Sequence, residues 1–128
     1  MIQNMKQLAP ILLGVLALAA QCPAGQSVFA CNLKAFQPEE RKVHDRLTAQ
    51  LRSAAVAWRE LPDGYSFQMD PRKVSLAQIA EWAVLERKCC PFFDYQLDLH
   101  SEENTLWFTL KGREGVKRFI EMEVPWAR

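Results

Sequence analysis

The segment Cys89-Cys90-Pro91 constrains this chain most, because a helical pattern ends there and a strand pattern begins. Proline disfavours helical geometry at the residue before it, so a helix entering this segment must end at about Cys89. The alternation of apolar and polar residues from Phe93 to Leu99 then predicts a strand. Two adjacent cysteines therefore lie at a helix-to-strand junction, and we expect their side chains to point in different directions.

Helical spacing elsewhere predicts two further helices. Pro38 suits the first turn of a helix that runs to about Ala55, because its missing N–H is not needed there. Ser75 and Gln78 form a capping-box pattern at the start of the helix that ends at Cys89, and Val116 opens a short terminal helix. The apolar face expected for the capped helix comprises Leu76, Ile79, Ala80, Ala83 and Val84.

Two hairpins complete the pattern. The sequence Leu61-Pro62-Asp63-Gly64 is typical of a turn, and it separates residues 56–60 from an alternating segment, 65–69. A polar turn at residues 100–104 separates residues 93–99 from residues 106–111. The order helix-hairpin-helix-hairpin-helix predicts an α+β fold with two layers, in which helices cover one face of a mainly antiparallel four-stranded sheet.

Residues 1–30 have the character of a signal peptide. One lysine precedes an apolar segment, Leu8 to Ala20, which is shorter than the ~20 residues that span a bilayer. Small residues at Val28 and Ala30 predict cleavage before Cys31, and Ala20 marks a second candidate site. We expect an exported protein, periplasmic or extracytoplasmic, with residues 31–128 forming a single domain; the alternative is an uncleaved membrane anchor.

The sequence gives little indication of binding to nucleic acid or to a membrane. The formal net charge is +1 and no basic block is present, which excludes an electrostatic case for nucleic-acid binding. Besides the leader, a lipid on Cys31 after lipoprotein-type cleavage is the one membrane contact that the pattern allows. Phe29 argues against that lipid, because it is bulkier than the residue usual before such a site.

The cysteine pair is the best candidate for a chemical site. A disulfide between adjacent residues is strained, because their Cα atoms are only about 3.8 Å apart, and strained disulfides are easily reduced. Two thiolates also suit a thiophilic metal or metalloid. We expect a metal site formed by Cys89, Cys90, His100 and Glu86, and the hypothesis is a small domain that binds such an ion or senses redox state.

Other ligand sets and other functions stay open. His44 and Asp94 are alternative ligands, no zinc motif spacing is present, and the sequence names no cofactor. The alternative function is a structural or interaction domain with both cysteines packed in the core. It would form a homodimer or bind a protein partner through exposed aromatic residues such as Trp107 and Trp82, unless helices cover both rings. An enzyme with a nucleophilic cysteine ranks last, because no base is visible.

A resemblance accompanies these patterns. The run from Glu86 to Tyr95, the turn at Leu61-Pro62-Asp63-Gly64 and the segment Gly112-Arg113-Glu114-Gly115-Val116 resemble a group of short uncharacterised bacterial domains. These domains carry a segment of the type Glu-Arg-x-Cys-Cys-Pro-Phe-Phe. The resemblance covers roughly residues 39–121 and implies one domain with the cysteine pair as its hallmark, but no activity.

Overall fold

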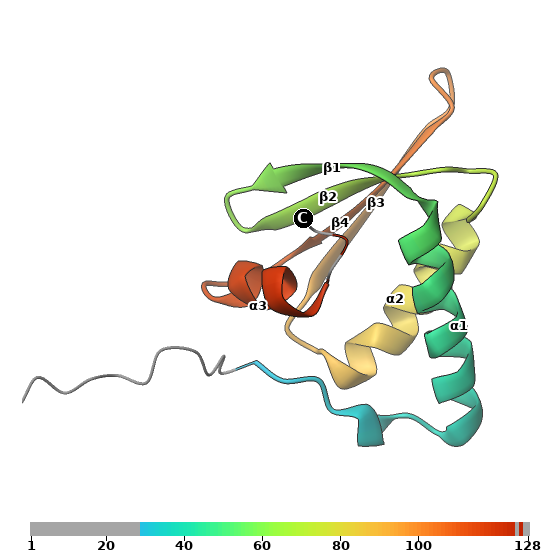
Figure 1. The fold of residues 1–128 in the computed structure, drawn as a ribbon. Helices are drawn as coiled ribbons and strands as arrows, with labels where there is room; N and C mark the ends of the chain where they lie inside the picture. The colour runs from blue at the N-terminus through green and yellow to red at the C-terminus, as the bar shows by residue number, and fades with distance from the viewer. Residues whose placement is uncertain (1–28, 125, 127–128) are drawn as a thin grey trace, which may run out of the picture.

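An antiparallel sheet in the order β1-β2-β4-β3 forms one layer of the molecule (Figure 1). The computed structural model describes residues 29–124 and 126. The strands are β1 (Ala55–Leu61), β2 (Gly64–Met69), β3 (Asp94–His100) and β4 (Thr105–Lys111). Each hairpin joins neighbours in sequence, and the β2–β4 pairing joins the two hairpins at the centre of the sheet.

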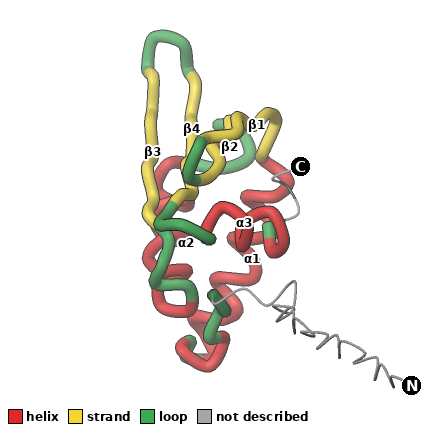
Figure 2. The backbone as a smooth tube through the Cα atoms, turned by 90° about the vertical axis from the view of Figure 1, so that its left-hand side faces the viewer, coloured by secondary structure: helices red, strands yellow, loops and turns green. Residues whose placement is uncertain are grey.

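Helices form the second layer. They are η1, a short 3-10 helix (Leu33–Ala35), α1 (Pro38–Ala54), α2 (Leu76–Cys89) and α3 (Val116–Glu123). The longer helices lie on one side of the sheet, and Figure 2 shows the far end of the β3–β4 hairpin extending beyond them. The α+β fold and the element order predicted from the sequence are therefore confirmed.

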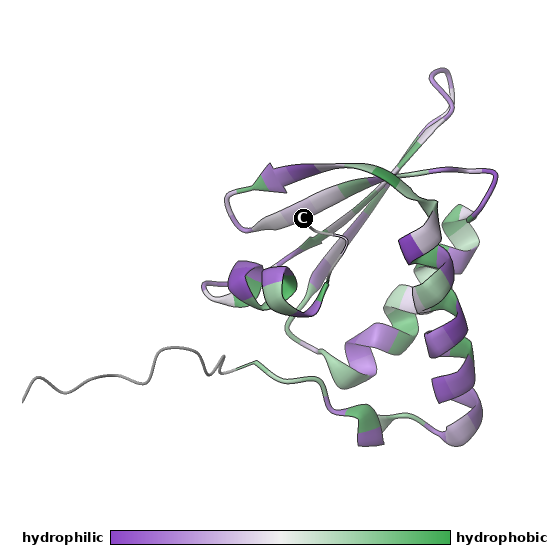
Figure 3. Ribbon diagram, in the orientation of Figure 1, coloured by the Kyte–Doolittle hydropathy of each residue, from purple (hydrophilic) through white to green (hydrophobic). Residues whose placement is uncertain are grey.

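The core forms between the two layers because β2 and β4 present alternate residues to the helices. Tyr65, Phe67 and Met69 are buried on β2, while Ser66 and Gln68 between them are only partly covered. Phe67 pairs with Phe108 across the centre of the sheet. Figure 3 shows apolar residues along these strands and on the inward parts of the helices. This alternation places the apolar surface of both hairpins against the helices.

The first hairpin turns where the sequence predicted. Leu61 pairs with Gly64, and β1 continues α1 directly at Ala55. A Cβ on Gly64 would lie only 2.1 Å from the Leu110 carbonyl oxygen on β4. Glycine is therefore required at this position because the neighbouring backbone leaves no room for a side chain.

Two details of the predicted packing were wrong. Leu76 and Val84 of α2 are exposed, whereas Trp82 and Glu86 are buried. The prediction placed the buried face of α2 too far to one side because the apolar side chains at positions 76, 80 and 84 also follow helical spacing. The face that is buried lies to one side of that row. An exposed patch containing Trp82 is excluded, since the ring is only 4% exposed and its Nε1–H donates to Thr48 Oγ1 of α1 at 2.9 Å.

The N-terminal segment enters the core before the first helix. Phe29 is buried, with its ring centroid 4.8 Å from that of Phe92. The predicted leader lies outside the described residues up to position 28. Phe29 and Ala30, the last two residues of the predicted leader, are the part of it that the structure describes. Within the described residues, no helix has both the length and the apolar character needed to cross a membrane.

Acid sensitivity is expected at the loop between β2 and α2. The Asp70 carboxylate accepts hydrogen bonds from the Arg72 guanidinium at 2.9 and 3.0 Å, and these lower the pKa of Asp70 to about 2. A lowered folded-state pKa stabilises the fold above the unfolded pKa of about 4, and that stability is lost as pH falls through about 2. Asp70→Asn should therefore reduce the loss of stability between pH 4 and pH 2.

Urea unfolding at several pH values checks this expectation. Asp63→Asn, at an exposed turn residue, is the matched control and should keep the wild-type slope of stability against pH. If Asp70→Asn and wild type lose stability in parallel from pH 4 to pH 2, the Asp70–Arg72 interaction is not responsible.

Candidate functional site

A disulfide joins the N-terminal segment to the end of α2. Cys31 is bonded to Cys90, with a Cα–Cα distance of 4.9 Å and a sequence separation of 59. The backbone N–H of Asn32 donates to the Cys89 carbonyl at 2.9 Å, which holds the two segments side by side. Cys90 therefore pairs with a distant cysteine, and the strained disulfide between neighbours does not form.

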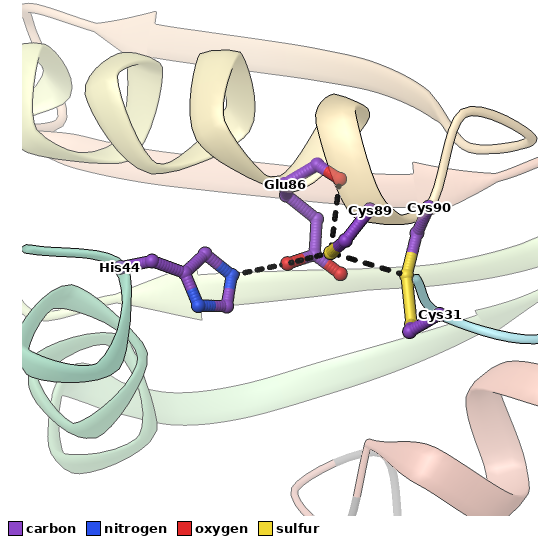
Figure 4. The surroundings of a disulfide bond; sticks show 5 residues. All are labelled: Cys31, His44, Glu86, Cys89 and Cys90. Carbon is purple, nitrogen blue, oxygen red and sulfur yellow. Dashed lines mark hydrogen bonds and ion pairs between the residues drawn. A yellow bond between two sulfur atoms is a disulfide. The ribbon is translucent and has the colours of Figure 1, made fainter. Parts of the chain in front are cut away.

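The helix end positions the remaining thiol. The Cys90 N–H donates to the Glu86 carbonyl at 2.8 Å and completes the last turn of α2. Cys89 is buried and free, and its Sγ lies 3.3 Å from the same carbonyl. Its Sγ also lies 3.6 Å from Cys90 Sγ (Figure 4). The expectation that the two side chains point in different directions was wrong, because the turn at Cys90 brings both sulfurs together beneath the helix.

A buried carboxylate and an imidazole extend this cluster. Glu86 Oε2 lies 3.7 Å from Cys89 Sγ and shares a hydrogen bond with His44 Nε2 of α1 (Figure 4). Glu86 is only 7% exposed, so it is not the solvated helix-end charge that its neighbours Arg87 and Lys88 suggest. Phe36 packs on the His44 ring with a centroid distance of 4.7 Å. The side chains of Cys89, Glu86 and His44 are thus in contact one after another in the interior of the protein.

The environment keeps the free thiol protonated at neutral pH. Burial first, and then the nearby Glu86 carboxylate, raise the pKa of Cys89 to about 12. Burial, together with the charges of Glu86 and Cys89, also raises the pKa of Tyr95. Both shifts have the direction expected of acids that lose solvent and face a negative charge. A cation at this position would reverse the effect on Cys89, because a bound metal deprotonates a coordinating thiol.

The cluster has the composition and dimensions of a soft metal site. Ligand atoms of Cys31, Glu86, Cys89 and Cys90 all lie within 4.8 Å of one another. A tetrahedral zinc with Zn–S bonds of about 2.3 Å separates two sulfur ligands by about 3.8 Å and a sulfur from an oxygen by about 3.6 Å. In this structure Cys89 Sγ lies 3.6 Å from Cys90 Sγ and 3.7 Å from Glu86 Oε2, close to these two ligand–ligand distances. The Cys31–Cys90 bond must open before these sulfurs could hold an ion.

The residues predicted as ligands divide into two groups. Cys89, Cys90 and Glu86 come together, whereas His100 ends β3 and is exposed. It follows Asp94 by six residues, which is roughly 20 Å along a strand. Asp94 is exposed at the start of β3 and lies outside the cluster of ligand atoms. The reason is geometric: proximity in sequence to a junction does not place a residue near it once an extended strand intervenes.

Sequence reasoning missed Cys31 as a partner, and it named His44 only as an alternative ligand, whereas His44 lies against Glu86. Cys31 was considered only as a lipidation site, and its sulfur is occupied by the disulfide. One signal was present: cysteines 31, 89 and 90 are an odd number in a domain expected to be exported, which indicates one disulfide and one free thiol. For His44, 42 residues before Glu86, no local signal existed.

Comparisons with protein-family profiles, with curated protein sequences and with solved structures found no match to this chain. The resemblance to short bacterial domains therefore stays an expectation, and function must be argued from the site itself.

Slow alkylation of Cys89 is expected in the native protein. Its thiol is buried and its pKa is raised to about 12, so at pH 8 the reactive thiolate is roughly 1,000-fold scarcer than for a thiol of pKa about 9. The measurement uses a Cys22→Ser background, because Cys22 is a further cysteine that lies outside the described residues. Iodoacetamide labelling followed by mass spectrometry gives the rate before and after unfolding. If Cys89 in the native protein is labelled as fast as a solvent-exposed thiol, Cys89 is not buried with a raised pKa.

Proposed function

We propose that the reduced protein binds a thiophilic metal ion, with zinc as the best-fitting case, through Cys31, Cys89, Cys90 and Glu86. The observation that carries the proposal is the convergence of three sulfurs and one carboxylate within 4.8 Å. Three thiolates and an oxygen are a recognised zinc donor set, and soft thiolate ligands also suit Cu(I). In the oxidised protein the Cys31–Cys90 disulfide removes two of the three thiolates, so binding depends on redox state.

The surroundings of the cluster support a bound ion. A carboxylate that ligates a metal is itself usually hydrogen-bonded, and His44 Nε2 shares a hydrogen bond with Glu86 Oε2, the oxygen that faces Cys89 Sγ. Tyr95 Oη is buried and has no hydrogen-bond partner among the described residues, while His44 Nδ1 has only the Asp45 carboxylate, at 3.7 Å. Unsatisfied buried polar atoms in a native fold often mark an ion or water site.

Metal titration of two redox forms tests the proposal. The Cys22→Ser background is reduced with a phosphine under argon, titrated with Zn(II) or Cu(I), and compared with the oxidised form. We expect one equivalent of ion bound by the reduced form, four ligand atoms at bonding distance by X-ray absorption, and no binding by the oxidised form. The same weak binding in both forms would reject the proposal.

A second function class rests on a separate observation. Val56 and Trp58 on edge strand β1 are exposed by 60% and 45%, and exposed apolar residues on an edge strand are typical of partner surfaces. Trp107, the residue expected to form such a surface, is instead half-buried, with the Arg59 guanidinium 3.8 Å from its ring centroid. This alternative is an interaction domain whose cysteines serve only packing and cross-linking.

The oligomeric state of Trp58→Ser checks the interaction surface. If β1 forms a homodimer, size exclusion should show a dimer for wild type and a monomer for Trp58→Ser. Val84→Ser, which changes an apolar residue of α2 that is 59% exposed, is the control and should behave as wild type. A wild-type monomer at high concentration would rule out the homodimer.

A further inference from the structure

The two sulfurs of the Cys31–Cys90 disulfide differ in access. Cys31 is exposed on the N-terminal segment, whereas Cys90 is fully buried. Thiol–disulfide exchange begins with attack of a thiolate on one sulfur, and accessibility decides which sulfur is attacked. Of the two residues only Cys31 borders solvent, so attack by a thiol from solution is expected at Cys31.

Attack at Cys31 makes the buried Cys90 sulfur the leaving group. Attack on Cys31 forms a bond between the incoming sulfur and Cys31 Sγ and breaks the Cys31–Cys90 bond. The electron pair leaves on Cys90 Sγ, which takes up the proton that the incoming thiol has lost. The Cys89 thiol lies 3.6 Å from Cys90 Sγ and can donate its S–H either to that sulfur or to Glu86, whose carbonyl oxygen is 3.3 Å away.

A positively charged hollow adjoins the accessible sulfur. Residues on both sides of Cys31 line a surface hollow of about 520 Å³, whose charged lining residues are Lys88 and Arg113, with no acidic residue. Lys88 is paired with Glu40, so Arg113 supplies most of the uncompensated charge. Its guanidinium lies 4.7 Å from the Phe29 ring centroid, which holds it over the hollow. The full lining comprises Phe29, Ala30, Asn32, Lys88, Cys89, Pro91, Phe92 and Arg113.

We propose that the Cys31–Cys90 disulfide exchanges with a small thiol that carries a carboxylate, and that this thiol docks beside Arg113 and forms a mixed disulfide with Cys31. A second molecule of the thiol releases the first as its disulfide and leaves Cys31 and Cys90 reduced. In reverse, the Cys90 thiolate attacks the mixed disulfide at Cys31, expels the small thiol and restores the native bond. This activity does not require a metal ion.

Exchange with two thiols of different charge tests the proposal. Glutathione, an anionic thiol, and 2-mercaptoethanol, a neutral one, react with the oxidised full chain in the Cys22→Ser background with a chelator present. We expect Arg113→Gln to slow reduction by glutathione about three- to tenfold, and to leave the rate with 2-mercaptoethanol unchanged. Arg46→Gln removes an exposed arginine of α1 outside the hollow and should change neither rate. Higher salt should diminish the glutathione effect.

The position of the adduct gives a second readout. In Cys90→Ser, Cys31 is a free thiol, so it is treated with oxidised glutathione, whose disulfide exchanges with Cys31 and releases one molecule of glutathione. The mixed disulfide lacks its resolving thiol, and peptide mass spectrometry should find glutathione on Cys31 and none on Cys89. Glutathione attached to Cys89 would overturn the proposal. So would an Arg113→Gln variant in which the rates of reduction by glutathione and by 2-mercaptoethanol fall equally, or in which neither rate changes. Since the Arg113 rates are measured on the intact disulfide and without metal, they stand even if Cys90→Ser folds poorly or zinc binding fails.

Discussion

Cys89→Ser is expected to weaken zinc binding by the reduced protein at least about 100-fold, exceeding the upper end of the 10–100-fold loss typical for an outer-shell partner. Cys89 is the central ligand of the proposed site, because its Sγ lies 3.6 Å from Cys90 Sγ and 3.7 Å from Glu86 Oε2. Serine keeps the approximate size of the side chain but offers a hydroxyl in place of a soft thiolate. Competition with a chromophoric chelator under reducing conditions measures the affinity.

Two histidines provide a matched pair of controls for that measurement. His44→Gln removes the side chain that hydrogen-bonds Glu86 and should weaken zinc binding about 10–100-fold. His100→Gln changes the histidine that the sequence suggested as a ligand, but it lies at the far end of β3 and should have no effect. Glu86→Gln and Glu81→Gln form a second pair, because Glu81 is exposed on the same helix.

The pattern of affinities across the five variants decides the ligand set. Loss of affinity in His100→Gln, or full affinity in Cys89→Ser, would show that any bound metal uses residues outside this cluster. Equal small losses in all variants would indicate nonspecific binding. Far-UV circular dichroism of each reduced variant verifies that the fold is retained before affinities are compared.

Cys31→Ser is expected to lower the free energy of unfolding by about 4 kcal/mol. The disulfide closes a loop with a sequence separation of 59, and the chain-entropy treatment of such a cross-link gives about 4 kcal/mol at 25 °C. The effect is large because stabilities of small domains are only about 5–15 kcal/mol. The physical reason lies mainly in the unfolded chain, which gains freedom when the cross-link is removed.

Urea unfolding of the Cys22→Ser background and its Cys31→Ser derivative measures this change. Cys89→Ser keeps the disulfide and should lose markedly less stability than Cys31→Ser, which makes it the control for disturbance of the buried cluster. Chemical reduction of the parent protein without metal should reproduce the Cys31→Ser result. Equal stability of oxidised and reduced parent protein would show that the cross-link does not hold the N-terminal segment in the fold.

These two expectations are linked through the same sulfur atoms. A ligand that binds only the folded state stabilises it by about 4 kcal/mol at 1,000 times its dissociation constant. Zinc at that concentration should therefore raise the free energy of unfolding of the reduced protein by about as much as reduction of the disulfide lowered it. Cys31→Ser should recover less, since it lacks one of the ligands. The metal and the disulfide would then be alternative ways to hold Phe29 and Cys31 against the end of α2.

Much of the secondary structure could be predicted from local sequence because the determining forces are local. Pro91 ends α2 at Cys89 through a steric effect on the preceding residue. The Ser75–Gln78 capping box forms as expected. Alternating apolar residues produced both hairpins, since strand periodicity records which face is buried. The order of elements then allows few ways to cover one sheet face, so the two-layer fold also followed.

The buried face of α2 was less predictable. Two rows of side chains on that helix follow helical spacing, and one of them includes only apolar residues. The observed face instead contains Trp82 and Glu86, which are covered because α1 supplies Thr48 and His44 as hydrogen-bond partners. A polar residue can be buried when a partner satisfies it, and a partner from another helix leaves no mark in the local pattern.

The sequence by itself determined the helix-to-strand junction at Cys89-Cys90-Pro91 and the chemistry available there. Tertiary structure alone decided that Cys31 closes on Cys90, that Glu86 is buried with His44, and that His100 is distant. Periodicity and capping act over a few residues, whereas these contacts join atoms 42 and 59 residues apart. Such contacts depend on how the layers pack, and so the cluster of sulfurs and carboxylate becomes visible only in the folded chain.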